Sequence, residues 1–132
     1  MSRYLIVDDS PTVRLMVKSA IRKLVGEGAE IDEVEDADAA LASFKQRAPS
    51  VVFLDMMLAR QSTGAVALDT ILREKADAKV VLVTGLPPTH PDVIEAISRG
   101  AFGFIAKPVR SDAIRDILDQ IAGESGSQIR IR

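Results

Sequence analysis

Five short segments that suit β-strands, each followed by a longer segment with helical spacing, constrain the fold of this sequence most strongly. Four of them are apolar runs, residues 4–7, 51–54, 80–83 and 102–105. Two of these, 51–54 and 80–83, are unbroken, as is typical of strands buried on both faces of a sheet. The fifth, residues 30–34, alternates charged with apolar residues, which predicts an edge strand whose charges discourage pairing with another sheet.

The intervening segments carry apolar residues three or four positions apart, which is the spacing of amphipathic helices. Their predicted limits follow from N-caps, prolines and glycines: Ser10 and Pro11 to Gly26, Asp36 to Pro49, residues 64–76, Pro91 to Gly100, and Ser111 onwards. Such alternation predicts an α/β fold with a doubly wound parallel sheet, right-handed crossovers and helices on both faces.

The chain has 132 residues, which suits one domain and leaves little room for a second. We expect that domain to occupy residues 1–122. Residues 123–132 begin with GESGS, a flexible-linker composition, and are predicted to form a flexible tail or a truncated linker.

The composition excludes several classes of function. Cysteine is absent, which rules out disulfides, thiolate metal sites and cysteine nucleophiles. His90 is the one histidine, and its position before Pro91 favours a helix cap or a solvent-facing position over catalysis. The net charge of -2 argues against a nucleic-acid-binding protein. No run approaches the roughly 20 apolar residues that span a bilayer, and no signal peptide is recognisable, so we expect a cytoplasmic location.

Polar side chains gather where the predicted strands end. Asp8 and Asp9 follow the first strand, Asp55 the third and Thr84 the fourth, and Lys107 comes shortly after the fifth. Ligands of doubly wound sheets bind beyond the carboxyl ends of the strands, so these groups should meet in one pocket. Three neighbouring carboxylates require a cation, and Mg²⁺ prefers oxygen ligands. Mg²⁺ and Lys107 would balance their charge and stabilise a phosphoryl group.

Most of these residues also have a purely structural interpretation, although Asp55 is harder to explain in that way. Asp8 and Asp9 precede a helix N-terminus, where acidic residues are common. Thr84 suits a strand because it is β-branched, and Lys107 with Pro108 suits a turn. The combination at four strand ends favours a functional site.

The same residues, in this order and spacing, resemble the receiver domain of two-component response regulators (CheY-like). The resemblance covers residues 3–122, and residues 5–10 (LIVDDS) and 100–108 (GAFGFIAKP) match family signatures closely. It implies a flavodoxin-like (βα)5 fold with strand order 2-1-3-4-5. It also implies a phosphoacceptor that is not an enzyme.

Residue by residue, the resemblance implies that Asp55 accepts a phosphoryl group from a phosphohistidine. Asp8 and Asp9, together with Asp55 and the backbone carbonyl of Met57, would hold Mg²⁺. Lys107 would pair with the acceptor carboxylate and then with the phosphoryl oxygens.

The resemblance also implies a switch. Thr84 would hydrogen-bond a phosphoryl oxygen, and Phe104 would turn inward as Thr84 moves. The Lys107–Pro108 peptide would be cis. Phosphorylation would then change an output surface on the fourth helix, fifth strand and fifth helix, near residues 94–121, while the first helix, near residues 11–18, docks the phosphodonor.

The sequence departs from the family pattern around the pocket. Ala59 stands where proline is usual, residues 60–63 hold one extra residue, and Gly85 replaces the commoner alanine or serine. The positions expected to flank the phosphate, Met57 and Leu86, are both apolar. We therefore predict slow self-dephosphorylation.

The expected partners are a sensor histidine kinase or a histidine phosphotransfer protein, and a downstream protein target. We expect no direct contact with nucleic acid or membrane, and a monomer or a phosphorylation-dependent dimer. An alternative is a phosphorylation-independent interaction module on the same fold. A phosphohydrolase with an aspartate nucleophile is less consistent, because the first strand lacks an Asp-x-Asp motif. The sequence leaves open whether an output domain follows Arg132.

Overall fold

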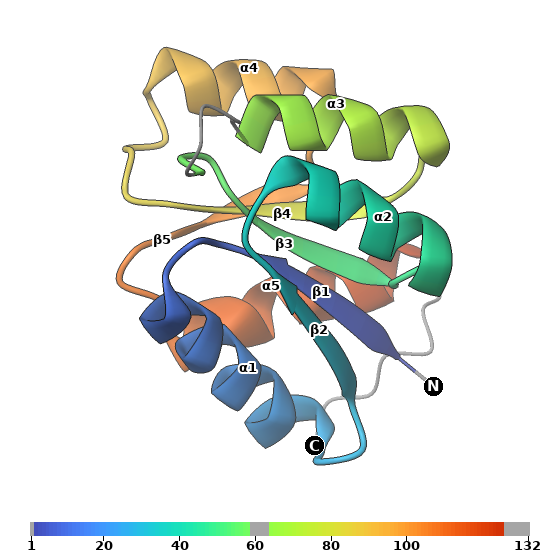
Figure 1. The fold of residues 1–132 in the computed structure, drawn as a ribbon. Coiled ribbons are helices and arrows are strands. Elements are labelled where there is room, and N and C mark those ends of the chain that lie inside the picture. Colours follow the sequence, from blue (N-terminus) through green and yellow to red (C-terminus); the bar gives the residue numbers. More distant parts are fainter. Residues whose placement is uncertain (1, 59–63, 126–132) are drawn as a thin grey trace.

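The computed structural model describes residues 2–58 and 64–125. Strands and helices alternate along them (Figure 1): β1 (Arg3–Val7), α1 (Pro11–Val25), β2 (Glu30–Val34), α2 (Ala37–Arg47), β3 (Val51–Asp55), α3 (Gly64–Glu74), β4 (Lys79–Thr84), α4 (Pro91–Arg99), β5 (Gly103–Ala106) and α5 (Ser111–Ser125). The strands form one parallel sheet in the order β2-β1-β3-β4-β5. This confirms the predicted α/β fold, strand order and edge position of residues 30–34.

Helices cover both faces of the sheet, α1 and α5 one face and α2, α3 and α4 the other (Figure 1). Successive strand residues point to opposite faces, so each strand serves two core clusters. In β1, Tyr4 and Ile6 pack toward α1 and α5, whereas Leu5 and Val7 pack toward the other three helices. Phe53 lies in the middle of the sheet and is fully buried.

The predicted helix caps mostly hold. Ser10 is the N-cap of α1 and accepts a hydrogen bond from the Val13 amide at 3.3 Å, and Asp36 caps α2 in the same way. The His90 imidazole caps α4 by accepting from the Asp92 amide at 3.1 Å, which confirms its predicted role. Helix α3 ends at Glu74, two residues before the predicted end.

The C-terminal elements differ from the prediction in their limits. Ser111 is the first residue of α5 and not its cap, because the Arg110 carbonyl already accepts from the Ile114 amide. The helix continues to Ser125, three residues beyond the predicted domain boundary at 122. Glycine weakens a helix without having to end it, and Gly123 is accommodated within α5. The rest of the predicted tail, residues 126–132, lies outside the described residues.

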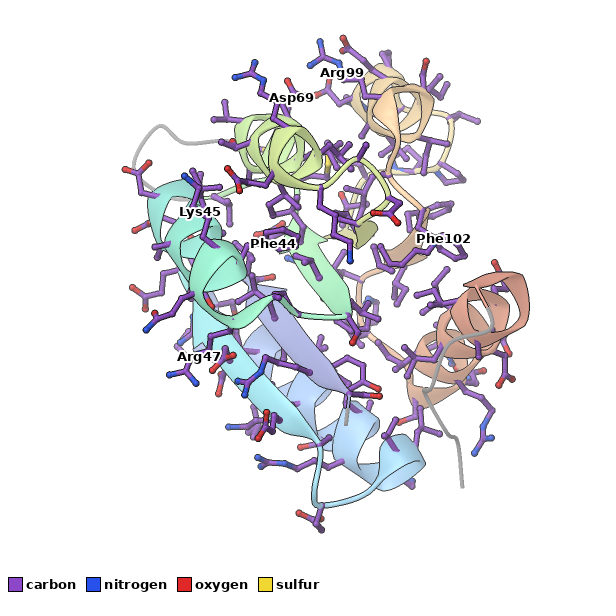
Figure 2. The ribbon with its side chains drawn as sticks, turned by 90° about the vertical axis from the view of Figure 1, so that its right-hand side faces the viewer. Phe44, Lys45, Arg47, Asp69, Arg99 and Phe102 are labelled. Atoms are coloured by element: carbon purple, nitrogen blue, oxygen red, sulfur yellow. The ribbon has the colours of Figure 1, made fainter. Side chains whose placement is uncertain are left out.

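Ion pairs join neighbouring elements at the surface. Lys45 of α2 pairs with Glu74 of α3 at 3.5 Å, and Arg99 of α4 pairs with Asp69 of α3 at 2.6 Å. Figure 2 shows Lys45 beside the buried Phe44, and Asp69 facing Arg99. Such exposed pairs contribute at most about 1 kcal/mol each, so the two apolar clusters hold the helices on the sheet. Within residues 2–58 and 64–125, no helix has the length and apolar character needed to cross a membrane.

Candidate functional site

The predicted site residues meet at the carboxyl edge of the sheet. Asp8 follows β1, Asp55 ends β3, Thr84 ends β4 and Lys107 follows β5. Asp8, Asp55 and Thr84 are between 1% and 3% exposed, and apart from Tyr4, whose hydroxyl is also buried, no other residue with a polar or charged side chain is buried among those that the structure describes. Burying polar groups costs free energy unless they are compensated, so their concentration at one point marks a functional site.

Three carboxylates converge in this pocket. Asp8, Asp9 and Asp55 each offer an oxygen, and these oxygens lie within 4.8 Å of one another. The buried Oδ2 of Asp8 has no hydrogen-bond partner in the described part of the chain. The Lys107 ammonium lies 3.3 Å from it and 3.4 Å from Oδ1 of Asp55. One ammonium cannot balance three carboxylates, so the pocket fits a divalent cation with oxygen ligands, such as Mg²⁺.

The groups around Asp55 change the pKa of its carboxyl in both directions. Its Oδ1 accepts a hydrogen bond from the Met57 amide at 3.1 Å. Burial raises the pKa of the Asp55 carboxyl above its ordinary value, and the nearby Asp8 carboxylate raises it further. The hydrogen bond from the Met57 amide and the charge of the Lys107 ammonium lower that pKa, but the net effect is a raised pKa.

Without divalent metal, Asp55→Asn is expected to raise the free energy of unfolding at neutral pH. The pKa of this carboxyl is raised in the folded protein, so ionised Asp55 destabilises the fold above that pKa. Asparagine has no charge and can still accept the Met57 hydrogen bond. The advantage should shrink as the pH falls through the raised pKa, and vanish below the ordinary value of 3.8. Urea unfolding of the wild-type chain and the variant in EDTA, over a pH series, measures the difference in their free energies of unfolding. A difference that does not change with pH would contradict the explanation.

Thr84 links the end of β4 to the segment that follows β5. The Thr84 hydroxyl oxygen accepts a hydrogen bond from the Leu86 amide at 3.0 Å, which leaves the hydroxyl proton able to donate. Its backbone carbonyl accepts from the Lys107 amide at 2.8 Å. The Lys107–Pro108 peptide is cis, as predicted. Phe104 is half-buried against the apolar cluster beneath α2, α3 and α4. Its role as a switch remains a prediction.

Two predicted features concern the segment that follows β3. The Met57 side chain is 69% exposed beside the pocket, and ligation of metal by its carbonyl remains a prediction. The departures at Ala59 and residues 60–63 lie outside the described residues.

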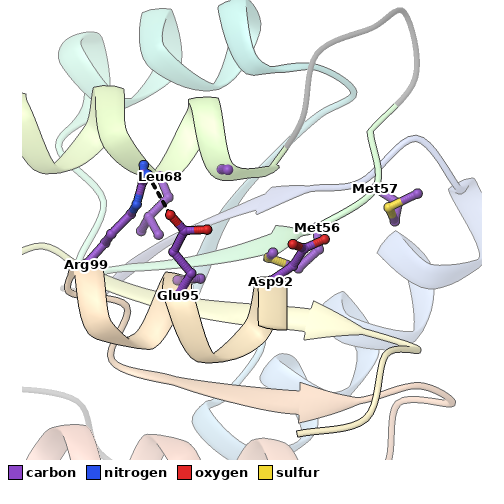
Figure 3. A pocket seen from close by; sticks show the side chains of 8 residues that line it. Met56, Met57, Leu68, Asp92, Glu95 and Arg99 are labelled. Atoms are coloured by element: carbon purple, nitrogen blue, oxygen red, sulfur yellow. Dashed lines mark hydrogen bonds and ion pairs between the residues drawn. The ribbon is translucent and has the colours of Figure 1, made fainter. Parts of the chain in front are cut away.

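A groove between α3 and α4 adjoins this loop and was not foreseen from the sequence. It has a volume of about 280 Å³, and Met56 and Leu68 line it together with Asp92 and Glu95 of α4 (Figure 3). Arg99 at one end is paired with Glu95 at 2.8 Å. The groove contains none of the three clustered carboxylates, so the chemistry belongs to the sheet edge and not to the groove.

Sequence reasoning missed two residues that support the site. Gly64 packs against the end of β3, where a Cβ would overlap the Asp55 carbonyl oxygen and lie 2.7 Å from Met56 Cα. Arg14 donates a hydrogen bond to the Asp8 carbonyl at 2.6 Å. Gly64 gave no signal beyond its place at the start of a predicted helix. Arg14 could have been suspected, because Glu33 and Glu35 lie near the end of the neighbouring strand.

The five-stranded parallel (βα)5 fold thus carries an acidic cluster and a lysine at the carboxyl edge of its sheet. The chain matches the family described as response regulator receiver domain over residues 4–119, and it belongs to that family. This match confirms the predicted resemblance to a receiver domain.

Individual relatives agree with this assignment. The chain is 36% identical to the nitrogen assimilation regulatory protein NtrX of Azorhizobium caulinodans over 114 residues, which are 83% of this chain and 24% of NtrX. It is 31% identical to the chemotaxis protein CheY of Bacillus subtilis over 119 residues, which are 89% of this chain and 95% of CheY. The chain thus spans a quarter of one relative and nearly all of the other.

Solved structures show the same likeness. The receiver domain of NtrX from Brucella abortus superposes with a TM-score of 0.82 at 33% identity, covering 92% of this chain and 99% of that domain.

Proposed function

We propose that this chain is a phosphorylation-driven switch in which Asp55 accepts a phosphoryl group from a phosphohistidine. The observation that carries the proposal is the burial of Asp55 beside two further carboxylates and the Lys107 ammonium. Family membership supports a histidine kinase or a histidine phosphotransfer protein as the donor.

Each residue of the pocket has a role in the transfer. An Asp55 carboxylate oxygen forms the new bond to phosphorus as the bond between phosphorus and the donor imidazole breaks. The imidazole nitrogen keeps the electron pair and takes up a proton. Lys107, already 3.4 Å from Asp55 Oδ1, neutralises charge on the phosphoryl oxygens. Asp8, Asp9, Asp55 and the Met57 carbonyl would hold Mg²⁺, which would supply the remaining positive charge.

The charge change drives the switch. The acyl phosphate carries about one more negative charge than the carboxylate it replaces. The Thr84 hydroxyl can donate to a phosphoryl oxygen, which would draw the β4–α4 loop inward. Because the Thr84 carbonyl accepts from the Lys107 amide, this movement is coupled to the segment after β5. The modification thereby biases a two-state equilibrium at the α4-β5-α5 surface.

Exposed apolar side chains support the two expected contact surfaces. Leu15 and Met16 on α1 are 57% and 38% exposed, on the side where we expect the phosphodonor. Ile94 and Ile97 on α4 are 56% and 40% exposed, within the proposed output surface for a downstream protein. Isolated apolar side chains are common at surfaces, and here they coincide with the faces that the switch requires.

Mg²⁺-dependent labelling tests the proposed function. The purified chain is incubated with acetyl phosphate, with either Mg²⁺ or EDTA, and its intact mass is measured. We expect a gain of one phosphoryl group only with Mg²⁺, and removal of that group by hydroxylamine, which cleaves acyl phosphates. Mg²⁺ at 100 times its dissociation constant should also raise the free energy of unfolding by about 2.7 kcal/mol. Absence of both effects would favour the phosphorylation-independent interaction module.

A further inference from the structure

Arg14 contacts the backbone of the acidic segment that follows β1. It lies in the second turn of α1, and its side chain is 13% exposed. Its Nη1 donates a hydrogen bond to the Asp8 carbonyl at 2.6 Å, and its Nε donates to Glu33 Oε1 at 3.3 Å. Its Nη2 lies 3.8 Å from Glu35 Oε1. One guanidinium therefore joins α1 to the Asp8 backbone and to the end of β2.

The hydrogen bond from Arg14 restrains the peptide that connects two of the clustered carboxylates. The Asp8 carbonyl belongs to the peptide bond between Asp8 and Asp9. Asp8 is held further by its amide, which donates to the Val34 carbonyl at 3.1 Å, and by its Oδ1, which accepts from the Ser10 amide at 2.8 Å. Asp9 is exposed, and no hydrogen bond or ion pair within the described residues restrains its side chain. The direction of Asp9 thus depends on the peptide that Arg14 holds.

We propose that Arg14 is a positioning residue for the metal site, which holds the Asp8–Asp9 peptide so that both carboxylates face Asp55. This inference rests on the proposed function, because it takes Asp8 and Asp9 as Mg²⁺ ligands. The buried Asp8 Oδ2, which has the Lys107 ammonium at 3.3 Å but no hydrogen bond within the described residues, and the convergence of the three carboxylates fit a cation there. Residues that orient metal ligands commonly change metal affinity by about 10-fold to 100-fold.

Electrostatics gives the opposite expectation, which makes the proposal testable by its sign. Removing a positive charge near a cation site strengthens cation binding when charge alone matters. Removing a positioning hydrogen bond weakens binding. Lys18 provides the matched control, because it lies one turn further along α1 and pairs with Glu33 at 2.9 Å. Lys18 shares the charge and the acidic partner of Arg14, and no contact with the Asp8 carbonyl is found for it among the described residues.

The experiment compares Arg14→Met and Lys18→Met with the wild-type chain. Mg²⁺ is titrated into the folded proteins and followed by the amide signals in ¹H–¹⁵N spectra. We expect Arg14→Met to bind Mg²⁺ about 10-fold more weakly. Lys18→Met should bind with unchanged or slightly higher affinity. The Asp9 amide nitrogen, which belongs to the restrained peptide, should shift in metal-free Arg14→Met and not in Lys18→Met.

The outcomes separate the two proposals. Equal or tighter Mg²⁺ binding by Arg14→Met, with a wild-type chain that binds Mg²⁺, would overturn the role of Arg14 and leave the proposed function standing. A wild-type chain that does not bind Mg²⁺ would overturn the metal site itself. Where Arg14→Met does not fold, Arg14→Gln is measured by the same criterion, since glutamine is polar but too short for all three contacts.

Discussion

Asp55→Asn is expected to lower Mg²⁺-dependent labelling by acetyl phosphate at least about 100-fold. The variant keeps the size of the side chain and an oxygen that can accept from the Met57 amide. It loses the carboxylate oxygen that must form the bond to phosphorus, because an amide is a poor nucleophile. Intact-mass measurement over a time course with Mg²⁺ and acetyl phosphate gives the labelling rates of the wild-type chain and of Asp55→Asn.

A matched control removes a carboxylate elsewhere. Asp36 caps α2 by accepting from the Ala39 amide at 2.8 Å, and asparagine is an equally good N-cap. Asp36→Asn should therefore fold normally and label at the wild-type rate. Labelling of Asp55→Asn at a rate close to that of Asp36→Asn would show that another residue is the acceptor.

Phe53→Ala is expected to lower the free energy of unfolding by about 3–5 kcal/mol. Phe53 is fully buried in β3, between β1 and β4, and belongs to the cluster covered by α1 and α5. Its truncation removes apolar contacts and leaves a cavity that the flanking strands cannot close. Urea unfolding followed by circular dichroism measures the loss.

Leu15→Ala serves as the control for this change. Leu15 is 57% exposed on α1, so its truncation should change the free energy of unfolding by less than about 0.5 kcal/mol. A loss below about 1 kcal/mol for Phe53→Ala would mean that the centre of the sheet is packed less tightly than the structure shows.

Much of the fold and most of the pocket could be predicted from the sequence because both depend on local patterns. Apolar runs such as residues 51–54 set the strands, and the alternation with helices sets a parallel sheet. In a parallel sheet all carboxyl ends lie at one edge, so Asp8, Asp55 and Lys107 had to meet there. The positions of these residues at the ends of the predicted strands were therefore enough to predict the cluster.

The parts that could not be predicted depend on contacts between distant segments. The close approach of Gly64 to the Asp55 carbonyl is fixed by how α3 packs on β3. The contact of Arg14 with the Asp8 carbonyl depends on how α1 packs beside β2, and the same packing places Glu33 within reach of Arg14. The end of α5 at Ser125 could not be predicted either, because one glycine in a helical pattern does not decide whether the helix continues.

The most direct test of the acceptor assignment is chemical trapping. After incubation with acetyl phosphate and Mg²⁺, the chain is treated with borohydride, which reduces an acyl phosphate to an alcohol and converts the modified aspartate to homoserine. Peptide mapping by mass spectrometry then locates the change. We predict homoserine at position 55, and only when Mg²⁺ was present. Homoserine at any other aspartate, or its absence from a chain that carries a phosphoryl group, would contradict the assignment of Asp55 as the acceptor.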